Sequence, residues 1–129
     1  MAKKFSIKRD PTFKATVNLP SPGQEPVPVE FTFKWMDRKE LTKFNDDRYQ
    51  FFVTKVPDYA KEEGVTGIDV AQFVIDYEVP QLRAIIAGWD IEEEFNDENL
   101  QALVEAGSEL PAAIVNGYLA SYDKAREGN

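Results

Sequence analysis

Residues 27–35 run Val-Pro-Val-Glu-Phe-Thr-Phe-Lys-Trp, with an apolar residue at every second position. A period of two places the apolar side chains of a β-strand on one face and the remaining side chains on the other. The stretch 13–19 alternates in the same way, from Phe13 to Leu19. The two stretches therefore predict an antiparallel β-hairpin with one buried face.

The segment between the two strands, 20–26, is rich in proline and contains Gly23. This composition predicts a loop longer than a two-residue turn. Because proline has no N–H donor, we expect an edge strand or a bulge on at least one flank. A hairpin alone is marginal in water, so Phe31 and Phe33 need cover. We expect helices of the same chain to supply it, the alternative being another subunit or a partner.

The chain after the hairpin has the spacing of helices. Asp37 and Glu40 form a variant capping box, which predicts a helix that runs to about Thr54. Its end is set by Pro57, which disfavours a helical residue before it. One further turn is expected at 58–63.

A second helix is expected from Asp69, which has the side chain of an N-cap. Pro80 removes a donor and crowds the carbonyl four residues earlier, so we expect a break or kink at Glu78–Val79. Beyond it, the next apolar stripe is interpreted as helical and consists of Leu82, Ile85, Ile86 and Trp89.

The last third predicts two further helices. Asn96 or Asp97 caps the first, and Gly107 ends it. Ser108 caps the second, with Pro111 in its first turn, where a missing N–H costs little. Four small residues of this helix are expected to allow close contact with another helix: Ala112, Ala113, Gly117 and Ala120.

These elements define an α+β fold, with an N-terminal β-hairpin (a small antiparallel sheet) followed by a mostly α-helical C-terminal part. A chain of 129 residues has the length of one domain. We expect a single domain over 1–129, with a hairpin region at 1–36 and a helical region at 37–129.

Composition excludes several classes of function. The chain has no cysteine and no histidine, which removes disulfides, thiolate chemistry, the Ser-His-Asp triad and nearly all zinc or iron sites. The sequence predicts no catalysis, no cofactor and no metal. With 23 acidic and 15 basic residues, the net charge is −8, so binding of nucleic acid is not expected. No apolar run approaches the roughly 18–20 residues of a membrane span, and we expect a cytoplasmic protein without a membrane contact.

Charge is distributed unevenly along the chain. Residues 1–57 carry a net charge of +4 and residues 58–109 one of −12, and the stretch 90–109 holds eight acids and no base. One interpretation is a solvated acidic helix face. The other is a docking surface for a basic partner, including the N-terminal half of another copy, which predicts self-association.

Two places in the sequence are candidate protein-binding sites. Three consecutive apolar residues, 51–53, cannot all face one core, so part of this stretch is expected at the surface. Trp89 is either an interface anchor or a core residue, and the acidic run follows it. The candidate protein-binding residues are Phe51, Phe52, Trp89, Glu92, Glu93 and Glu94. The stripe of Tyr118, Leu119 and Tyr122 is interpreted as helix packing.

The C-terminal third resembles a known family. Its order of short strings carries the resemblance: Ile85-Ile86-Ala87-Gly88-Trp89-Asp90, then Phe95 and Glu98-Asn99-Leu100, then Pro111-Ala112-Ala113, Tyr118-Leu119, Ala125-Arg126 and Asn129. This sequence of strings, over about residues 82–129, is similar to the tail assembly chaperones of long-tailed phages and prophages. The departures are the extra glutamates at 92–94 and the stretch 106–109, where a more aromatic junction is expected.

The resemblance implies a function without catalysis. Such chaperones bind the long, helical tape measure protein, keep it soluble and help to recruit tail tube subunits. The resemblance also implies that the protein works in the cytoplasm of the bacterial host and is absent from the mature virion. Two alternatives remain open: a structural tail or neck component of the virion, and an acidic protein that mimics DNA.

Overall fold

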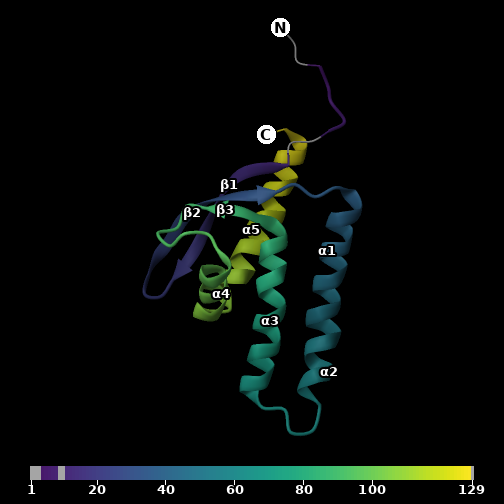
Figure 1. Cartoon of the computed structure of the whole chain (residues 1–129), viewed down its shortest axis with the longest axis vertical. Coiled ribbons are helices and arrows are strands. Elements are labelled where there is room, and N and C mark those ends of the chain that lie inside the picture. Colours follow the sequence, from purple (N-terminus) through teal and green to yellow (C-terminus); the bar gives the residue numbers. More distant parts are fainter. Residues whose placement is uncertain (1–3, 9–10, 129) are drawn as a thin grey trace.

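The computed structural model describes residues 4–8 and 11–128. Figure 1 shows a small sheet, a long helical arm that projects from it, and a C-terminal helix that crosses the sheet. The elements in chain order are β1 (Thr12–Ser21), β2 (Gln24–Lys34), α1 (Arg38–Gln50), the π-helical turn η1 (Phe51–Lys55), α2 (Val56–Ala60), α3 (Gly67–Ile85), β3 (Ile86–Trp89), α4 (Asp97–Ala106) and α5 (Glu109–Glu127). The α+β fold class predicted from the sequence is confirmed.

The hairpin has the predicted antiparallel pairing, with Val17 opposite Val29. The predicted long loop is wrong: β1 continues to Ser21 and β2 starts at Gln24, so only two residues form the turn. Gly23 makes this turn possible because its φ of 71° suits glycine. A register shift between Leu19 and Ser21 lies beside the turn, and β1 is an edge strand, so the expectation of an edge or a bulge is confirmed.

The sheet has a third strand that the sequence did not predict. α3 ends at Ile85, and β3 pairs antiparallel with β2, with Trp89 opposite Phe31. The predicted helical stripe is therefore wrong beyond Ile85. Four residues are too few to distinguish a helical from a strand period, and pairing with β2 satisfies backbone groups that an edge would leave open.

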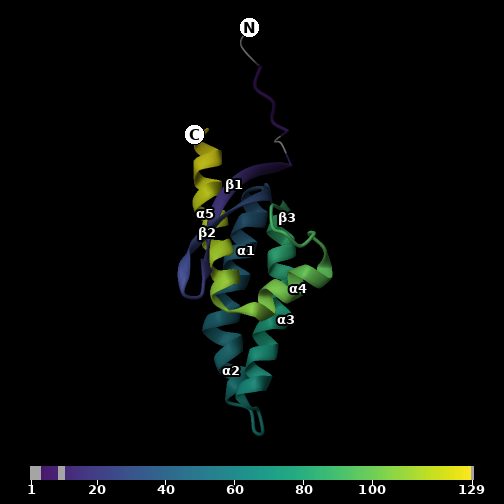
Figure 2. The same ribbon diagram turned by 90° about the vertical axis from the view of Figure 1, so that its left-hand side faces the viewer.

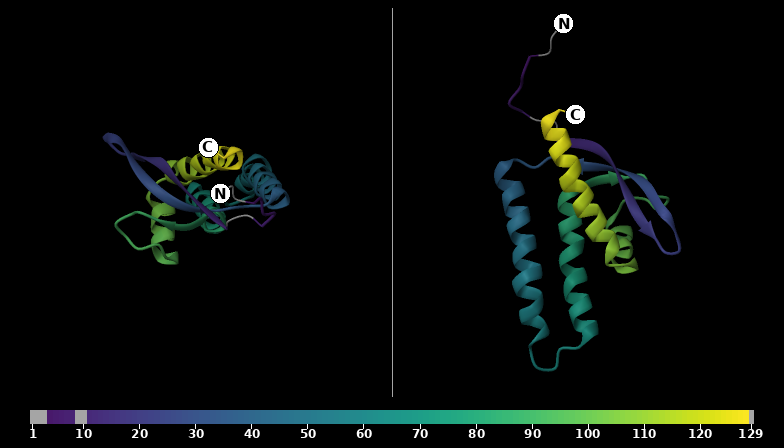
Figure 3. Two further views of the ribbon diagram at one scale, coloured as in Figure 1. Left: turned by 90° about the horizontal axis from the view of Figure 1, so that it is seen from above. Right: turned by 180° about the vertical axis from the view of Figure 1, so that it is seen from behind.

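Helices of the same chain cover the apolar face of the hairpin, as expected. Phe31 and Phe33 are fully buried, and α5 crosses this face in the rear view of Figure 3. Tyr118 of α5 is also fully buried, and its hydroxyl donates a 2.8 Å hydrogen bond to the Lys34 carbonyl. A Cβ on Gly117 would lie 2.6 Å from a methyl carbon of Val17, so this glycine lets α5 approach a strand rather than another helix. The predicted helix–helix role of Gly117 is wrong.

The first helix begins as predicted and ends later. Asp37 accepts a hydrogen bond from the Glu40 amide and donates its own amide to the Glu40 carboxylate, which is the capping box. The predicted end near Thr54 is wrong, because the helical path continues through η1 and α2 to Ala60. Immediately before Pro57, the Val56 amide donates to the Phe51 carbonyl, five residues back. This wider π turn lets the helix pass the proline without the usual break.

The second helix also continues past its proline. Thr66 is the N-cap, and Asp69 completes the capping box from the third helical position, which corrects the predicted cap. Of the two alternatives predicted at Glu78–Val79, the break is wrong, because α3 runs unbroken to Ile85. Because Pro80 has no N–H, the Asp76 carbonyl lacks its usual helical donor. Both residues are exposed, so water can donate to this carbonyl instead.

The last two helices follow the predicted pattern. Asn96 caps α4, and Gly107 ends it. Ser108 is at the N-cap of α5, although its hydroxyl makes no capping hydrogen bond. Figure 2 shows α4 lying across α3 and α5, below β3. An apolar hollow lies between α4 and the tip of the hairpin.

Candidate functional site

The helical arm is held together by a column of aromatic rings between its two sides. Phe51 is only 5% exposed and stacks on Tyr77, with ring centroids 3.8 Å apart, and on Phe73 at 5.3 Å. Tyr59 stacks on the same Phe73 at 4.4 Å. Phe51 is one of the predicted binding residues, but its ring points into this column. It can support a surface and offers little area to a partner.

Phe52 and Val53 lie on the outside of the arm, 39% and 52% exposed. The expectation that residues 51–53 do not all face one core is confirmed. Phe52 meets Phe51 edge-on at 5.0 Å, and the Arg48 guanidinium lies 6.0 Å from the Phe52 ring centroid. The ring is thus fixed in place with part of its face open to solvent.

Beside Phe52 is a cavity of about 250 Å³ between α1, α3 and the start of α5, which we call the arm groove. Its lining residues are Arg48, Phe52, Val74, Glu78, Gln81, Ser108, Pro111, Ala112 and Val115. Most of them are apolar, so the groove suits an apolar side chain of a partner.

Two polar residues of α3, Glu78 and Gln81, are each only 7% exposed in the arm groove. Burial raises the pKa of Glu78 from 4.5 to about 7, against the opposing effect of the Arg48 charge. The Gln81 amide nitrogen is buried without a hydrogen-bond partner among the described residues. Buried donors of this kind are rare in native proteins, and an unmade hydrogen bond costs free energy. The groove therefore combines apolar walls with a donor that lacks an acceptor.

Trp89 lies at the end of β3, where it organises the acidic loop that follows. Its indole N–H donates a 2.8 Å hydrogen bond to the Glu93 carbonyl, and its ring meets Phe95 edge-on at 4.9 Å. The Asn99 side chain donates to the Glu94 carbonyl at 2.8 Å. Trp89 packs against the core but is only half-buried. It therefore has features of a core residue and of an interface anchor, the two predicted interpretations.

The acidic loop presents its carboxylates to solvent. Glu92, Glu93 and Glu94 are all exposed, and within the described parts of the chain none of them has an ion pair. The ion pair found in the stretch 90–109 joins Arg83 to Asp97 at 2.9 Å. A fixed loop with three unpaired carboxylates creates a strongly negative surface.

Next to this loop is an apolar hollow beside the sheet, a cavity of about 400 Å³ that we call the hairpin groove. The tip of the hairpin, β3 and α4 form its walls. The lining residues are Leu19, Pro20, Ser21, Val27, Val29, Trp89, Ile91, Glu93, Asn99, Ala102, Leu103, Ala106 and Leu110. Its volume is within the range of about 300–1,000 Å³ that is typical of ligand pockets.

The six predicted binding residues thus belong to two separate surfaces. Trp89 and Glu93 line the hairpin groove, and Glu92 and Glu94 flank Glu93 in the acidic loop, whereas Phe51 and Phe52 are in the arm. Their role in binding stays a prediction. Sequence reasoning missed Glu78 and Gln81, although two polar residues beside the apolar positions 79 and 82 were a visible signal. The interpretation of Tyr118 and Tyr122 as packing residues is confirmed, since they are 0% and 4% exposed.

The structure offers no metal-binding cluster within residues 4–8 and 11–128. Over the same residues, no helix has the length and apolar character of a membrane span.

The two apolar grooves, one beside exposed aromatic and one beside acidic side chains, are the candidate binding surfaces of the molecule. A family model described as phage tail assembly chaperone matches residues 1–129, and the chain belongs to this family. No curated protein and no solved structure matches the chain significantly.

Proposed function

We propose that this chain binds the tape measure protein of a phage tail and helps to recruit tail tube subunits during assembly, without catalysing a reaction. Its membership of the tail assembly chaperone family supports this role. The observation that carries the proposal is the arm groove, an apolar hollow beside the exposed Phe52 with an unpartnered donor, Gln81, in its lining.

A helix is the partner segment that this groove fits best. Amphipathic helices place apolar anchors three and four residues apart and lay them into such hollows. The resemblance described above implies a long helical tape measure protein. In the proposed complex an apolar side chain enters the groove beside Phe52, and the Gln81 amide donates to a polar group of the partner. That hydrogen bond recovers part of the roughly 1–3 kcal/mol that the buried donor costs in the free protein.

We also propose that the protein acts in the cytoplasm of the bacterial host and leaves before the tail is mature. Mass spectrometry of purified particles tests this proposal. A chaperone predicts no peptides of this chain in the virion. A stoichiometric amount would identify a structural tail or neck component instead.

Self-association is the third part of the proposal. The net charge of +4 over residues 1–57 and of −12 over residues 58–109 lets one copy present complementary surfaces to the next. A head-to-tail contact of this kind is heterologous and continues as a ring or a spiral. A spiral suits the coating of a long helix, because each added copy covers a further length.

Co-expression with the neighbouring tape measure protein, followed by pull-down, tests the proposed binding. Ala112 is an exposed residue of α5 that lines the arm groove, and Ala120 is an exposed residue of the same helix outside it. We expect Ala112→Trp to fill the groove and abolish co-purification, whereas Ala120→Trp retains it. Circular dichroism verifies that both variants are folded. Equal co-purification of both variants would contradict the arm groove as the binding site.

A further inference from the structure

The N-terminal segment carries two of the most exposed apolar side chains of the molecule. Phe5 is 80% exposed and Ile7 is 89% exposed, and Lys4 and Lys8 flank them. In an extended chain, residues 5 and 7 point to one side and residues 4 and 8 to the other. The segment therefore has the pattern of an extended peptide with one apolar face and one basic face.

The hairpin groove has the complementary properties. It is an apolar cavity of about 400 Å³ with Trp89 in its wall, and Glu93 of the acidic loop lines its edge. Glu92 and Glu94 stand beside Glu93, exposed and without an ion pair within the described residues. An apolar hollow with an acidic border fits a peptide that offers apolar and basic side chains together.

We propose that the N-terminal segment of one copy, residues 4–8, docks into the hairpin groove of a second copy. Phe5 and Ile7 enter the cavity, and Lys4 and Lys8 lie over the glutamates of the acidic loop. This inference rests on the self-association proposed above and specifies its contact. It also assigns a role to both the exposed apolar side chains and the unpaired carboxylates.

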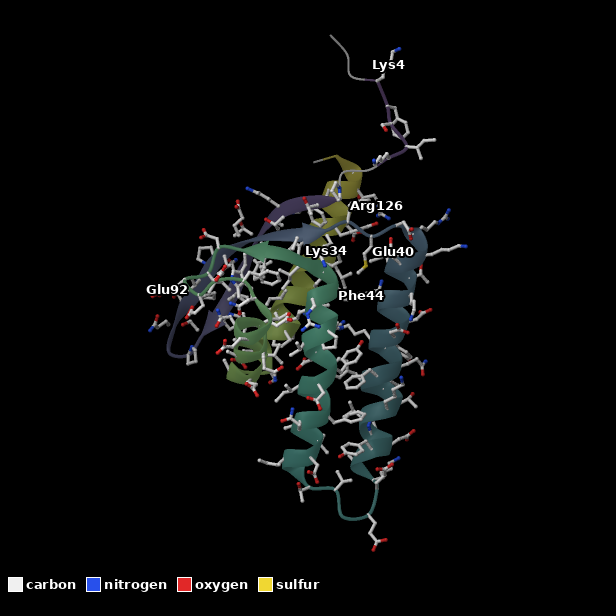
Figure 4. All side chains as sticks on the ribbon, in the orientation of Figure 1. Lys4, Lys34, Glu40, Phe44, Glu92 and Arg126 are labelled. Carbon is white, nitrogen blue, oxygen red and sulfur yellow. The ribbon has the colours of Figure 1, made fainter. Side chains whose placement is uncertain are left out.

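The geometry of the chain favours a second copy over the chain's own segment. Ile7 is five residues before Thr12 and reaches at most about 18 Å from it. Leu19, in the far wall of the groove, is seven residues along β1, or about 23 Å. Figure 4 shows Lys4 and Glu92 at widely separated places on the molecule. In this conformation the segment lies away from the groove of its own chain (Figure 4), which favours a second copy as the partner.

Each copy donates one segment and offers one groove, so the same contact either joins two copies that exchange segments or continues from copy to copy as a ring or a spiral. The charges steer the encounter and set its orientation, and the two apolar side chains contribute the buried area. Because exposed ion pairs are screened at physiological salt, the contact weakens as salt rises.

Analytical ultracentrifugation over a range of protein concentrations, at 50 and 500 mM NaCl, tests the contact on the full chain. We expect association that rises with concentration and falls with salt. Phe5→Ser with Ile7→Ser is expected to weaken it by about tenfold or more. Ile68→Ser is the matched control, since Ile68 is 81% exposed at the far end of the arm. It should leave association unchanged.

A charge exchange identifies the partners in the contact. Lys4→Glu with Lys8→Glu should not self-associate, nor should Glu92→Lys with Glu94→Lys. The first variant keeps an intact groove and the second keeps an intact segment, but each pairing within one variant is repulsive. Mixing them is expected to restore association between unlike copies, because the acidic segment of the first variant fits the basic loop of the second, and the basic segment of the second fits the acidic loop of the first. Combining all four substitutions in one chain restores opposite charges across the contact and should restore association.

The outcomes separate this proposal from those it builds on. A wild-type protein that is monomeric at every concentration overturns both the self-association and the docked segment. Association that persists in the Phe5/Ile7 variant overturns the docked segment alone, whereas association that tightens with salt overturns the charge-steered self-association as well. Binding of the tape measure protein is read separately, because Ala112→Trp changes the arm groove and leaves the hairpin groove intact.

Discussion

The sheet end and the helical arm bury their aromatic residues in different ways. At the sheet end, Phe31 and Phe33 of β2 and Tyr118 of the distant helix α5 are fully buried. In the arm, Phe51 stacks on Tyr77 of the neighbouring helix, while Phe52 beside it remains 39% exposed. The sheet end is thus a closed core, whereas the arm holds aromatic and polar groups at an open groove. The sheet end therefore provides stability, and the arm is the surface that we propose for the partner.

The largest expected effect is at the sheet end. Phe31→Ala removes a fully buried ring from the face that α5 covers. We expect a loss of roughly 3–5 kcal/mol in the free energy of unfolding, because a cavity remains where the ring was. Urea denaturation measures it. A loss below about 1 kcal/mol would show that this face is not the core.

The second effect is a pH dependence in the arm. The pKa of Glu78 is about 7 in the folded protein and 4.5 without burial, so the folded state holds the proton more tightly. This contribution to stability is present below pH 4.5 and is lost as pH rises through about 7. Between pH 5 and 8 we expect the free energy of unfolding of the wild type to fall by on the order of 3 kcal/mol more than that of Glu78→Gln. If the free energy of unfolding changes with pH by the same slope in both proteins, the prediction is wrong.

The third effect concerns the close contact between α5 and β1. A Cβ on Gly117 would lie 2.6 Å from Val17, and both positions are within the packed sheet end. Gly117→Ala is expected to destabilise the protein by roughly 1–3 kcal/mol, although alanine favours helices. Adding Val17→Ala should relieve the clash, so the double variant loses less than the sum of the two single variants. Strict additivity in a thermal melt would contradict the close approach.

Local sequence patterns predicted the hairpin and several helix ends, because these depend on neighbouring residues. The alternation at 27–35 gave the buried face, and Asp37 and Asn96 gave two helix starts. β3 was not predictable, because its apolar residues fit a helix and a strand equally well and only the position of β2 decides between them. Pro57 and Pro80 predicted helix ends that are absent, since a π turn precedes one and solvent surrounds the other.

The candidate site shows the same division. Trp89 and the glutamates at 92–94 are close in sequence, so their common surface was within reach of prediction. Neither groove could be predicted, because each is completed by a helix that is distant in sequence. This helix is α4 in the hairpin groove and α5 in the arm groove. The unpartnered state of Gln81 also depends on three-dimensional packing.

Hydrogen–deuterium exchange of the complex with the tape measure protein tests the central claim most directly, namely that the arm is the surface for this partner. We expect slower exchange of backbone amides at 48–53 and 74–81, on both sides of the arm groove, and little change along β1. The Ala120→Trp variant should show the same pattern. Protection confined to the hairpin and α4, with unchanged exchange in the arm, would contradict the account.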